Sequence, residues 1–264
     1  MTDEFFLRNR STHAVVTGGG QGLGLAIAKR LAREGAPSIV LAGRDKAKGE
    51  GAAAEVRALG PECIFVVADV AKAEDCARLI ETAIARFGTV NGLVNAAAAT
   101  SRGSLTDTTL DLWDEHMNTN LRGPFLLMQA MVRHLMDKGA PGSIVNILSQ
   151  SAYAGQPFLT PYSTSKGALA VLTKNVANAF ASNRIRCNGL MLGWMDTPAE
   201  DAVQQRYHGR QPGWLAEAEA AQPMGQLVKP DQVASLVAYM ISPESGVMTG
   251  ALVDYDQKVA GAYS

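Results

Sequence analysis

The sequence predicts a single doubly wound α/β domain, with a parallel sheet of seven strands flanked by helices. Short β-branched runs alternate with longer helical patterns along almost the whole chain, and this alternation is typical of βαβ units. The short runs are apolar at nearly every position, as expected for strands that helices cover on both faces. No proline-, glycine- or serine-rich linker and no repeat interrupts the 264 residues, so we expect residues 1–264 to form one domain.

Each element follows from its local pattern. Seven runs are typical of strands, at residues 14–17, 38–42, 63–67, 92–95, 143–148, 185–190 and 251–254. Residues 76–87 place apolar side chains at i, i+3, i+4, i+7 and i+8, which indicates an amphipathic helix, and residues 23–31 do the same. Further helices are expected at 46–59, 110–135, 162–181 and 230–241. Residues 193–226 break the rhythm, and we expect a long irregular loop that serves as a substrate-binding lid.

Composition excludes several classes of protein. The chain has 24 basic and 25 acidic residues, a net charge of -1, and no long run of either sign, so it lacks the electrostatic footprint of a protein that binds nucleic acid or anionic membranes. The acidic amino terminus has no apolar leader core and no window reaches the length of a membrane span, which predicts a cytoplasmic protein. Three scattered cysteines and four separated histidines predict neither disulfides nor a metal site, and the cysteines are expected to be buried.

A glycine-rich turn follows the first strand directly. The strand at 14–17 runs into Gly18-Gly-Gly-Gln-Gly-Leu-Gly24, and a helical pattern begins at once. Glycines let the backbone approach a pyrophosphate, which then lies against the helix N-terminus. A P-loop is disfavoured because no Gly-Lys-Ser/Thr follows, so the turn predicts a Rossmann-type dinucleotide site. The expected contacts are Gly18, Gly20, Gln21, Gly22, Leu23 and Gly24.

The end of the second strand predicts which dinucleotide binds. An acidic residue there would bind the ribose 2′-hydroxyl of NAD, but Gly43 occupies that place and Arg44 follows. Arg44 is suited to pair with the 2′-phosphate of NADP, so NADP is favoured. NAD remains the alternative, because a shift of one residue would bring Asp45 to the strand end.

Tyr162 and Lys166 lie one helical turn apart, on one face of the helix predicted there. An ammonium at about 4 Å and an effective dielectric near 20 favours the phenolate by about 4 kcal/mol. About the same free energy separates the phenol pKa, near 10, from neutrality. The pair therefore suits acid/base chemistry, but a Tyr-x-x-x-Lys spacing is common, and an incidental aromatic beside a solvated lysine is the alternative.

Several motifs in register resemble the short-chain dehydrogenase/reductase family, over nearly the whole chain. Thr17-Gly18-x-x-x-Gly22-x-Gly24 is similar to the cofactor turn of that family, and Asp69-Val70 to its adenine-contacting pair. The family's catalytic tetrad corresponds in order and spacing to Asn120, Ser149, Tyr162 and Lys166.

The resemblance implies a role for each tetrad residue. Tyr162 would be the general acid/base, and Ser149 would orient and polarise the substrate oxygen. Lys166 would lower the phenol pKa and hold the nicotinamide ribose, and Asn120 would support a water in the proton relay. From the residues alone, the alternative for Ser149 is to cap the end of its strand, and the alternative for Asn120 is to bridge two backbone groups in a helix kink beside Gly123-Pro124. The resemblance also implies a homotetramer.

Three segments depart from the family pattern. Asn95-Ala-Ala-Ala98 stands where the family has Asn-Asn-Ala-Gly, Leu192-Gly193 where it has Pro-Gly, and Asp254-Tyr-Asp256 where it has Asp-Gly-Gly. Alanine brings a methyl group where glycine leaves space. The contacts still expected with the cofactor in these segments are Asn95, Ala96, Ala97, Gly193 and Thr197.

The favoured function is an NADP-dependent oxidoreductase acting on a secondary alcohol or ketone. One alternative is a non-catalytic NADP-binding sensor or scaffold of the same fold. A second is a nucleotide-sugar epimerase or dehydratase, which is less favoured because those enzymes are generally longer and have a differently spaced glycine turn. A mixture of aromatic and polar residues is expected to face the substrate, which favours a sugar, a polyol or another small polar carbonyl compound. These residues are Gln150, Ser151, Tyr153, Phe158, Trp194 and Met195.

Overall fold

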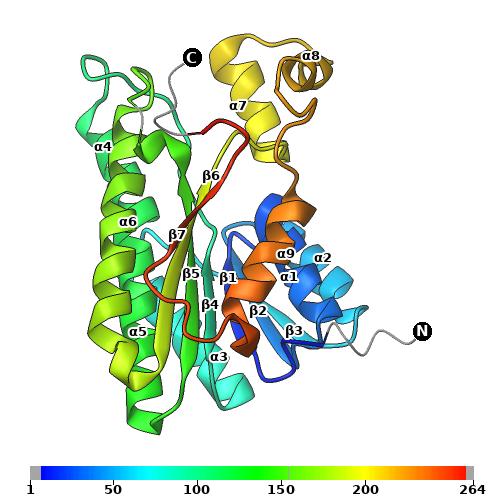
Figure 1. The fold of residues 1–264 in the computed structure, drawn as a ribbon, viewed down its shortest axis with the longest axis vertical. Coiled ribbons are helices and arrows are strands. Elements are labelled where there is room, and N and C mark those ends of the chain that lie inside the picture. Colours follow the sequence, from blue (N-terminus) through cyan, green and yellow to red (C-terminus); the bar gives the residue numbers. More distant parts are fainter. Residues whose placement is uncertain (1–6, 154, 260–264) are drawn as a thin grey trace.

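The computed structural model describes residues 7–153 and 155–259, so part of the acidic amino terminus lies outside the described residues. Its sheet is parallel, with strand order β3-β2-β1-β4-β5-β6-β7 (Figure 1). This is the predicted Rossmann-type fold, and the expected strand bounds agree to within one or two residues. The strands are β1 (His13–Thr17), β2 (Ser38–Gly43), β3 (Glu62–Val67), β4 (Gly92–Asn95), β5 (Gly142–Ser149), β6 (Ile185–Leu192) and β7 (Leu252–Tyr255).

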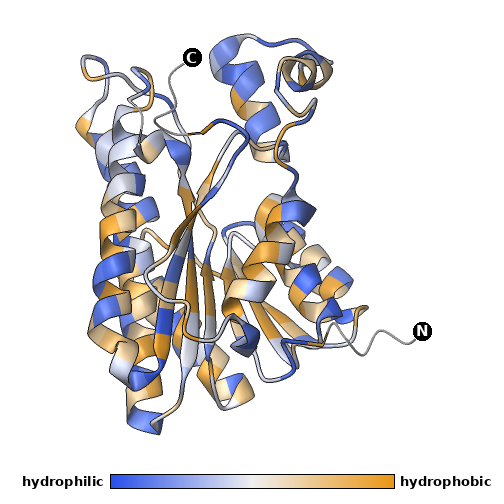
Figure 2. Ribbon diagram, viewed as in Figure 1, coloured by the Kyte–Doolittle hydropathy of each residue, from blue (hydrophilic) through white to orange (hydrophobic). Residues whose placement is uncertain are grey.

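Helices cover both faces of the sheet. One face carries α1 (Gly22–Arg33), α2 (Lys46–Arg57) and α9 (Pro230–Ile241), and the other carries α3 (Ala73–Phe87), α5 (Gly123–Lys138) and α6 (Thr160–Phe180). Apolar residues line the strands and gather on the helix surfaces that face them (Figure 2). The two cores on either side of the sheet hold the strands rigidly, so their carboxyl ends form a fixed platform.

The helix expected at 110–135 is not continuous. The structure has α4 (Leu110–Met117), a π-helical turn (Asn118–Arg122) and then α5. The π turn carries Asn120 inward, where it is fully buried. Just after it, Gly123 lies so close to the loop that follows β3 that a Cβ would lie 2.5 Å from the Val70 carbonyl oxygen. Apolar periodicity could not reveal this break, since a π turn adds one residue without changing which residues are apolar.

The segment 193–226 was expected to be irregular, and this expectation was wrong. It contains α7 (Pro198–His208) and α8 (Trp214–Ala220), which stand beyond the carboxyl end of β6 (Figure 1). Thr197 begins α7 by accepting a hydrogen bond from the Glu200 amide at 3.1 Å. Helix α7 has a weak sequence signal because it is polar on nearly every side, with only two buried residues.

The cysteines are free and buried, as predicted. Within the described ranges, no helix has both the length and the apolar character that a membrane span requires. The described residues also contain no cluster of three or more metal-binding side chains.

Candidate active site and dinucleotide groove

Two cavities open along the carboxyl edge of the sheet, near the adjacent strands β1 and β4. Here the strand order reverses, since β2 and β3 lie on one side of β1 and β4 to β7 on the other. In doubly wound sheets this switch point is where ligands bind. One cavity is a groove of about 440 Å³ over the glycine turn, and the other, of about 890 Å³, lies between α6 and α7. They meet at Leu23, Thr100 and Thr197, which line both.

The glycine turn builds the floor of the groove. Gly18 and Gly22 have φ of +67° and +54°, a region that favours glycine. A Cβ on Gly18 would lie 3.0 Å from the Ala97 amide nitrogen. The Thr17 hydroxyl accepts hydrogen bonds from the amides of Ala96 and Ala97 at 3.0 and 3.1 Å, which ties the turn to the end of β4.

The start of α1 fits a pyrophosphate. The N-cap residue, Gln21, makes no side-chain hydrogen bond to the first turn. The amide groups at this helix end therefore keep their capacity to bind an anion, which the helix dipole also favours. Most of the predicted cofactor contacts line this groove: Gly18, Gly20, Gln21, Gly22, Leu23, Gly24, Arg44, Asp69, Val70, Ala96, Ala97 and Thr197.

Two neighbours of the groove differ from expectation. Asn95 does not line it, because its side chain turns into the sheet and its amide donates to Asn146 at 2.8 Å. Ala98, which stands where the family has glycine, has an exposed side chain that lines the groove. Its extra methyl group is therefore at the surface of the groove and is not packed in the core.

The far end of the groove is basic. Gly43 ends β2, as predicted, and Asp45 is the N-cap of α2, where its carboxylate accepts from the Lys48 amide at 3.0 Å. Arg44 lines the groove, and so does Lys48, which no sequence motif marks. Asp45 also lines the groove there, with its carboxylate held at the start of α2 by the capping bond, so two cations and one carboxylate stand at the end of the groove where the adenosine ribose is expected.

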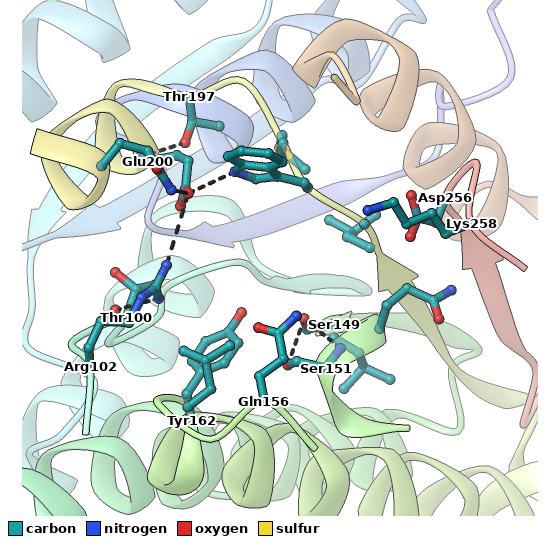
Figure 3. Close-up of a pocket in the computed structure, with 18 of the residues that line it drawn as sticks. Thr100, Arg102, Ser149, Ser151, Gln156, Tyr162, Thr197, Glu200, Asp256 and Lys258 are labelled. Carbon is teal, nitrogen blue, oxygen red and sulfur yellow. Dashed lines mark hydrogen bonds and ion pairs between the residues drawn. The ribbon is translucent and has the colours of Figure 1, made fainter. Parts of the chain in front are cut away.

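Tyr162 and Ser149 meet on the wall of the larger cavity (Figure 3). Tyr162 lies in the first turn of α6 and Ser149 ends β5. Burial raises the pKa of Tyr162, while the side-chain hydrogen bond with Ser149 and the charge of Arg102 oppose that rise. The phenol is therefore protonated in this structure at neutral pH. Ser149 also caps the following 3-10 turn, accepting from the Ser151 amide at 3.2 Å, so the structural alternative for Ser149 is realised as well.

Lys166 lies beside Tyr162, but its contacts differ from the electrostatic prediction. Its ammonium is 5.8 Å from the centre of the Tyr162 ring and donates to the Ile147 carbonyl at 2.7 Å. A buried ammonium needs an acceptor, and the β5 backbone supplies one. Burial lowers the pKa of Lys166 to about 8. In this structure the groups that lower the phenol pKa are Ser149 and Arg102, and Lys166 is not among them.

Asn120 bridges backbone groups, the alternative that its sequence position left open. Its side-chain oxygen accepts from the Ala99 amide at 2.7 Å, and its amide donates to the Ala99 carbonyl and to the Ser165 hydroxyl, both at 3.0 Å. Ser165 in turn donates to the Tyr162 carbonyl at 2.7 Å. The π turn thus reaches the backbone of Tyr162 through two side chains, which fixes the start of α6 against the loop after β4.

The larger cavity contains most of the predicted substrate residues. Tyr153 is an exception, since it does not line the cavity and its side chain is half exposed beside Asp254. The 3-10 turn at 150–152 directs it away, which the sequence did not indicate. The predicted substrate residues on the cavity wall are Gln150, Ser151, Phe158, Trp194 and Met195. Gly193, predicted as a cofactor contact, lines this cavity and not the groove.

Sequence reasoning missed a charged pair in this cavity. Arg102, from the loop after β4, lies 3.9 Å from the Glu200 carboxylate on α7 (Figure 3). Glu200 also accepts from the Trp194 indole at 2.8 Å and from the Gln204 amide at 2.6 Å. These residues are distant in sequence and share no motif spacing, so only the fold brings them together. The cavity is also lined by Thr100, Gln156, His208, Arg210, Gln222, Asp256 and Lys258.

Comparisons with known proteins agree with this geometry. A family model described as enoyl-(acyl carrier protein) reductase matches residues 18–257. The chain is 34% identical to (3R)-3-hydroxyacyl-CoA dehydrogenase of Canis lupus familiaris, over 94% of this chain and 96% of the relative. It is 33% identical to NADP-dependent (R)-specific alcohol dehydrogenase of Lentilactobacillus kefiri, over 95% and 96%.

A solved structure extends the likeness to the whole fold. The crystal structure of a variant of actinorhodin polyketide ketoreductase with NADPH superposes with a TM-score of 0.89 at 29% identity, covering 96% of this chain and 98% of the other. The matched family region takes in the glycine turn, the tetrad positions and the start of α7. This chain therefore belongs to the short-chain dehydrogenase/reductase family, and it is an NAD(P)-dependent oxidoreductase that acts on alcohol or ketone groups.

Proposed function

We propose that the protein interconverts a ketone and a secondary alcohol on a small polar substrate, with Tyr162 as the general acid/base and NADP as the preferred cofactor. One observation carries this proposal. The Tyr162 phenol and the Ser149 hydroxyl share the cavity wall beside the point where this cavity meets the dinucleotide groove. A substrate oxygen between those two hydroxyls would have its reacting carbon directed toward the groove.

The basic end of the groove supports the preference for NADP. Arg44 and Lys48 both line it and outnumber the Asp45 carboxylate, which also lines it and caps α2 through the Lys48 amide. A 2′-phosphate carries the charge that two such cations bind well. Among the relatives, one is described as NADP-dependent and the ketoreductase was solved with NADPH.

The chain's own residues would handle the proton. When bound, the nicotinamide supplies or accepts the hydride, with its two electrons, at the substrate carbon. In the reducing direction, the Tyr162 hydroxyl gives its proton to the substrate oxygen, and Ser149 donates a hydrogen bond to that oxygen as negative charge develops. The raised phenol pKa suits this direction, because the acid form predominates near neutrality.

Lys166 and Asn120 would support the acid/base group. With a pKa of about 8, Lys166 is largely charged at neutral pH. It does not lower the phenol pKa in this structure, so its proposed role of stabilising the phenolate left after proton transfer requires a closer approach once cofactor and substrate are bound. Tyr162 is then reprotonated from solvent. The proposed role of Asn120 is to hold the π turn and the start of α6 in register, where a relay water would bind.

The cavity favours a polar substrate. The amides of Gln150 and Gln156 and the hydroxyl of Ser151 line it together with the aromatic rings of Phe158 and Trp194. This mixture suits a polyol, a sugar or another small polar carbonyl compound. Residues 193–226, with α7 and α8, are proposed to act as the lid over this cavity. The homotetramer and the cytoplasmic location stay predictions from the sequence.

The test is Tyr162→Phe, assayed by NADPH absorbance with a panel of ketones and polyhydroxylated carbonyl compounds. Removing the acid is expected to lower kcat/KM by about 100- to 10,000-fold, while NADPH binding, measured by thermal shift, persists. Tyr207→Phe is the matched control, because Tyr207 lies on α7 outside the cavity lining.

The outcomes separate the alternatives. Unchanged turnover in Tyr162→Phe would contradict the proposed mechanism. A wild-type protein that binds NADPH and turns over nothing on the panel would favour the sensor or scaffold. Turnover of a nucleotide sugar with no net change in the cofactor would favour an epimerase or dehydratase.

A further inference from the structure

Arg102 brings unused hydrogen-bond donors to the substrate cavity. Its guanidinium has five N–H groups, and Nη1 donates to the Thr100 carbonyl at 3.0 Å. Its Nε is buried and has no partner among the described residues. The buried Nε is out of reach of the cavity, but Nη2 makes no hydrogen bond within the described residues. The Nη end of this cation on the cavity wall therefore has donors left for a ligand.

The position of Arg102 relative to Tyr162 is fixed by the backbone. Gly103 pairs with the start of α6, since its amide donates to the Phe158 carbonyl and its carbonyl accepts from the Thr160 amide, both at 3.0 Å. On its other side, Gly103 packs against the loop before α4, where a Cβ would lie 2.5 Å from the Thr108 hydroxyl oxygen. Figure 3 shows Arg102 beside Tyr162 on the same side of the cavity.

Glu200 does not use the capacity of Arg102. The two side chains approach only to 3.9 Å, which is an ion pair but not a hydrogen bond. The same Glu200 oxygen accepts shorter hydrogen bonds from Trp194 and Gln204. Glu200 is therefore held on α7 by uncharged donors, and the guanidinium remains available to the cavity.

We infer that Arg102 binds a carboxylate of the substrate, so that the preferred substrates are oxo acids and the corresponding hydroxy acids. This inference rests on the proposed function and narrows its substrate class. The planar fork of a guanidinium matches a carboxylate with two parallel hydrogen bonds. A phosphate dianion is less suited, because Glu200 lies on the same side of the cavity and would repel a second negative charge more strongly.

The experiment compares short 2-oxo, 3-oxo and 4-oxo acids, each paired with its uncharged methyl ester, using NADPH and NADH. The measured quantity is the ratio of kcat/KM for the acid to kcat/KM for its ester. We expect the wild type to prefer one acid by at least about tenfold, and Arg102→Met to lower that ratio by about 100-fold, as the loss of a buried charged pair does. Arg102→Lys, which keeps the charge and loses the fork, should lie between them.

Two variants serve as controls. Arg206→Met removes an exposed arginine of α7 that does not line the cavity, and the ratio should stay at its wild-type value. Lys258→Met removes another cation of the cavity wall. Thermal shift with NADPH checks that each variant is folded and binds the cofactor.

Each result decides the matter. A preference that survives Arg102→Met but disappears in Lys258→Met would overturn the assignment to Arg102. Equal turnover of acids and esters by the wild type would overturn the carboxylate itself, while leaving the proposed ketone reduction intact. If the wild type reduces neither acids nor esters but does reduce a ketone or polyhydroxylated carbonyl compound, only the carboxylate inference fails; if it binds NADPH and reduces none of these compounds, the proposed function fails as well.

Discussion

Arg44 offers a quantitative test of cofactor preference. The perturbation is Arg44→Ala, alone and together with Lys48→Ala, since both side chains line the basic end of the groove. A charge-assisted hydrogen bond contributes about 1.5–3 kcal/mol, and every 1.4 kcal/mol is about tenfold in affinity. Loss of Arg44 should therefore weaken NADPH binding by about 10- to 150-fold. The upper Coulomb figure, about 4 kcal/mol at 4 Å, is not reached, because the groove is open to solvent.

Asp45 provides the matched control. Its carboxylate caps α2 through the Lys48 amide, and asparagine caps helices about as well as aspartate. Asp45→Asn should keep the helix while removing one negative charge from the neighbourhood of the phosphate. We expect NADPH affinity to rise by a few-fold at most in this variant.

The assay is direct titration of each variant with NADPH and with NADH, in which binding is measured by calorimetry or by the fluorescence of the nicotinamide. NADH affinity should change by less than about threefold in Arg44→Ala, since NADH has no 2′-phosphate for the guanidinium to bind. If the wild type prefers NADH, or if Arg44→Ala weakens both cofactors equally, the reasoning from the end of β2 is refuted.

Two further predictions concern stability. Burial lowers the pKa of Lys166 from 10.5 to about 8, so its ammonium costs about 3 kcal/mol below pH 8, and this cost is relieved as the pH rises to 10.5. The wild type should therefore gain about 3 kcal/mol of unfolding free energy between pH 8 and pH 10.5, and Lys166→Met should not. In urea titrations, the difference in unfolding free energy between the variant and the wild type should fall by that amount across this window. A difference that does not vary with pH would contradict the burial argument. Gly24→Ala should lower stability by about 1–3 kcal/mol, because its Cβ would lie 2.3 Å from the Gly18 carbonyl oxygen. Gly20→Ala, whose Cβ would lie 3.7 Å from its nearest neighbour, should cost less, and equal losses would show that close approach is not the reason for Gly24.

The parallel sheet was predictable because its signal is local and strong. A strand such as Ser38–Gly43 is buried at nearly every position, so its composition alone separates it from the amphipathic helices around it. Helix α7 gave no such signal, because it packs few side chains and its start depends on the Thr197 cap. The π turn at 118–122 had a weaker signal, the Gly123-Pro124 pair, because the close approach of Gly123 to Val70 that accompanies it joins residues far apart in the chain.

The candidate site divides in the same way. Tyr162, Ser149 and the glycine turn were identified because motif spacing along the chain marks them. Helical spacing correctly placed Lys166 beside Tyr162, but it could not show that the Ile147 carbonyl would accept the hydrogen bond of the ammonium. Arg102 was missed altogether, because the pairing of the loop after β4 with the start of α6 brings it to the cavity.

The stacking of Trp194 on Trp214 gives the region around α7 and α8 an optical signature. The two indole rings have centroids 5.8 Å apart and are inclined by 22°, and the chain has only one other tryptophan, Trp113 on α4. Rings stacked this closely couple their excited states, so their emission and near-ultraviolet circular dichroism depend on the geometry of the pair. Any rearrangement of α8 against the end of β6 is therefore visible to spectroscopy in the unlabelled protein, with Trp113 as an internal reference.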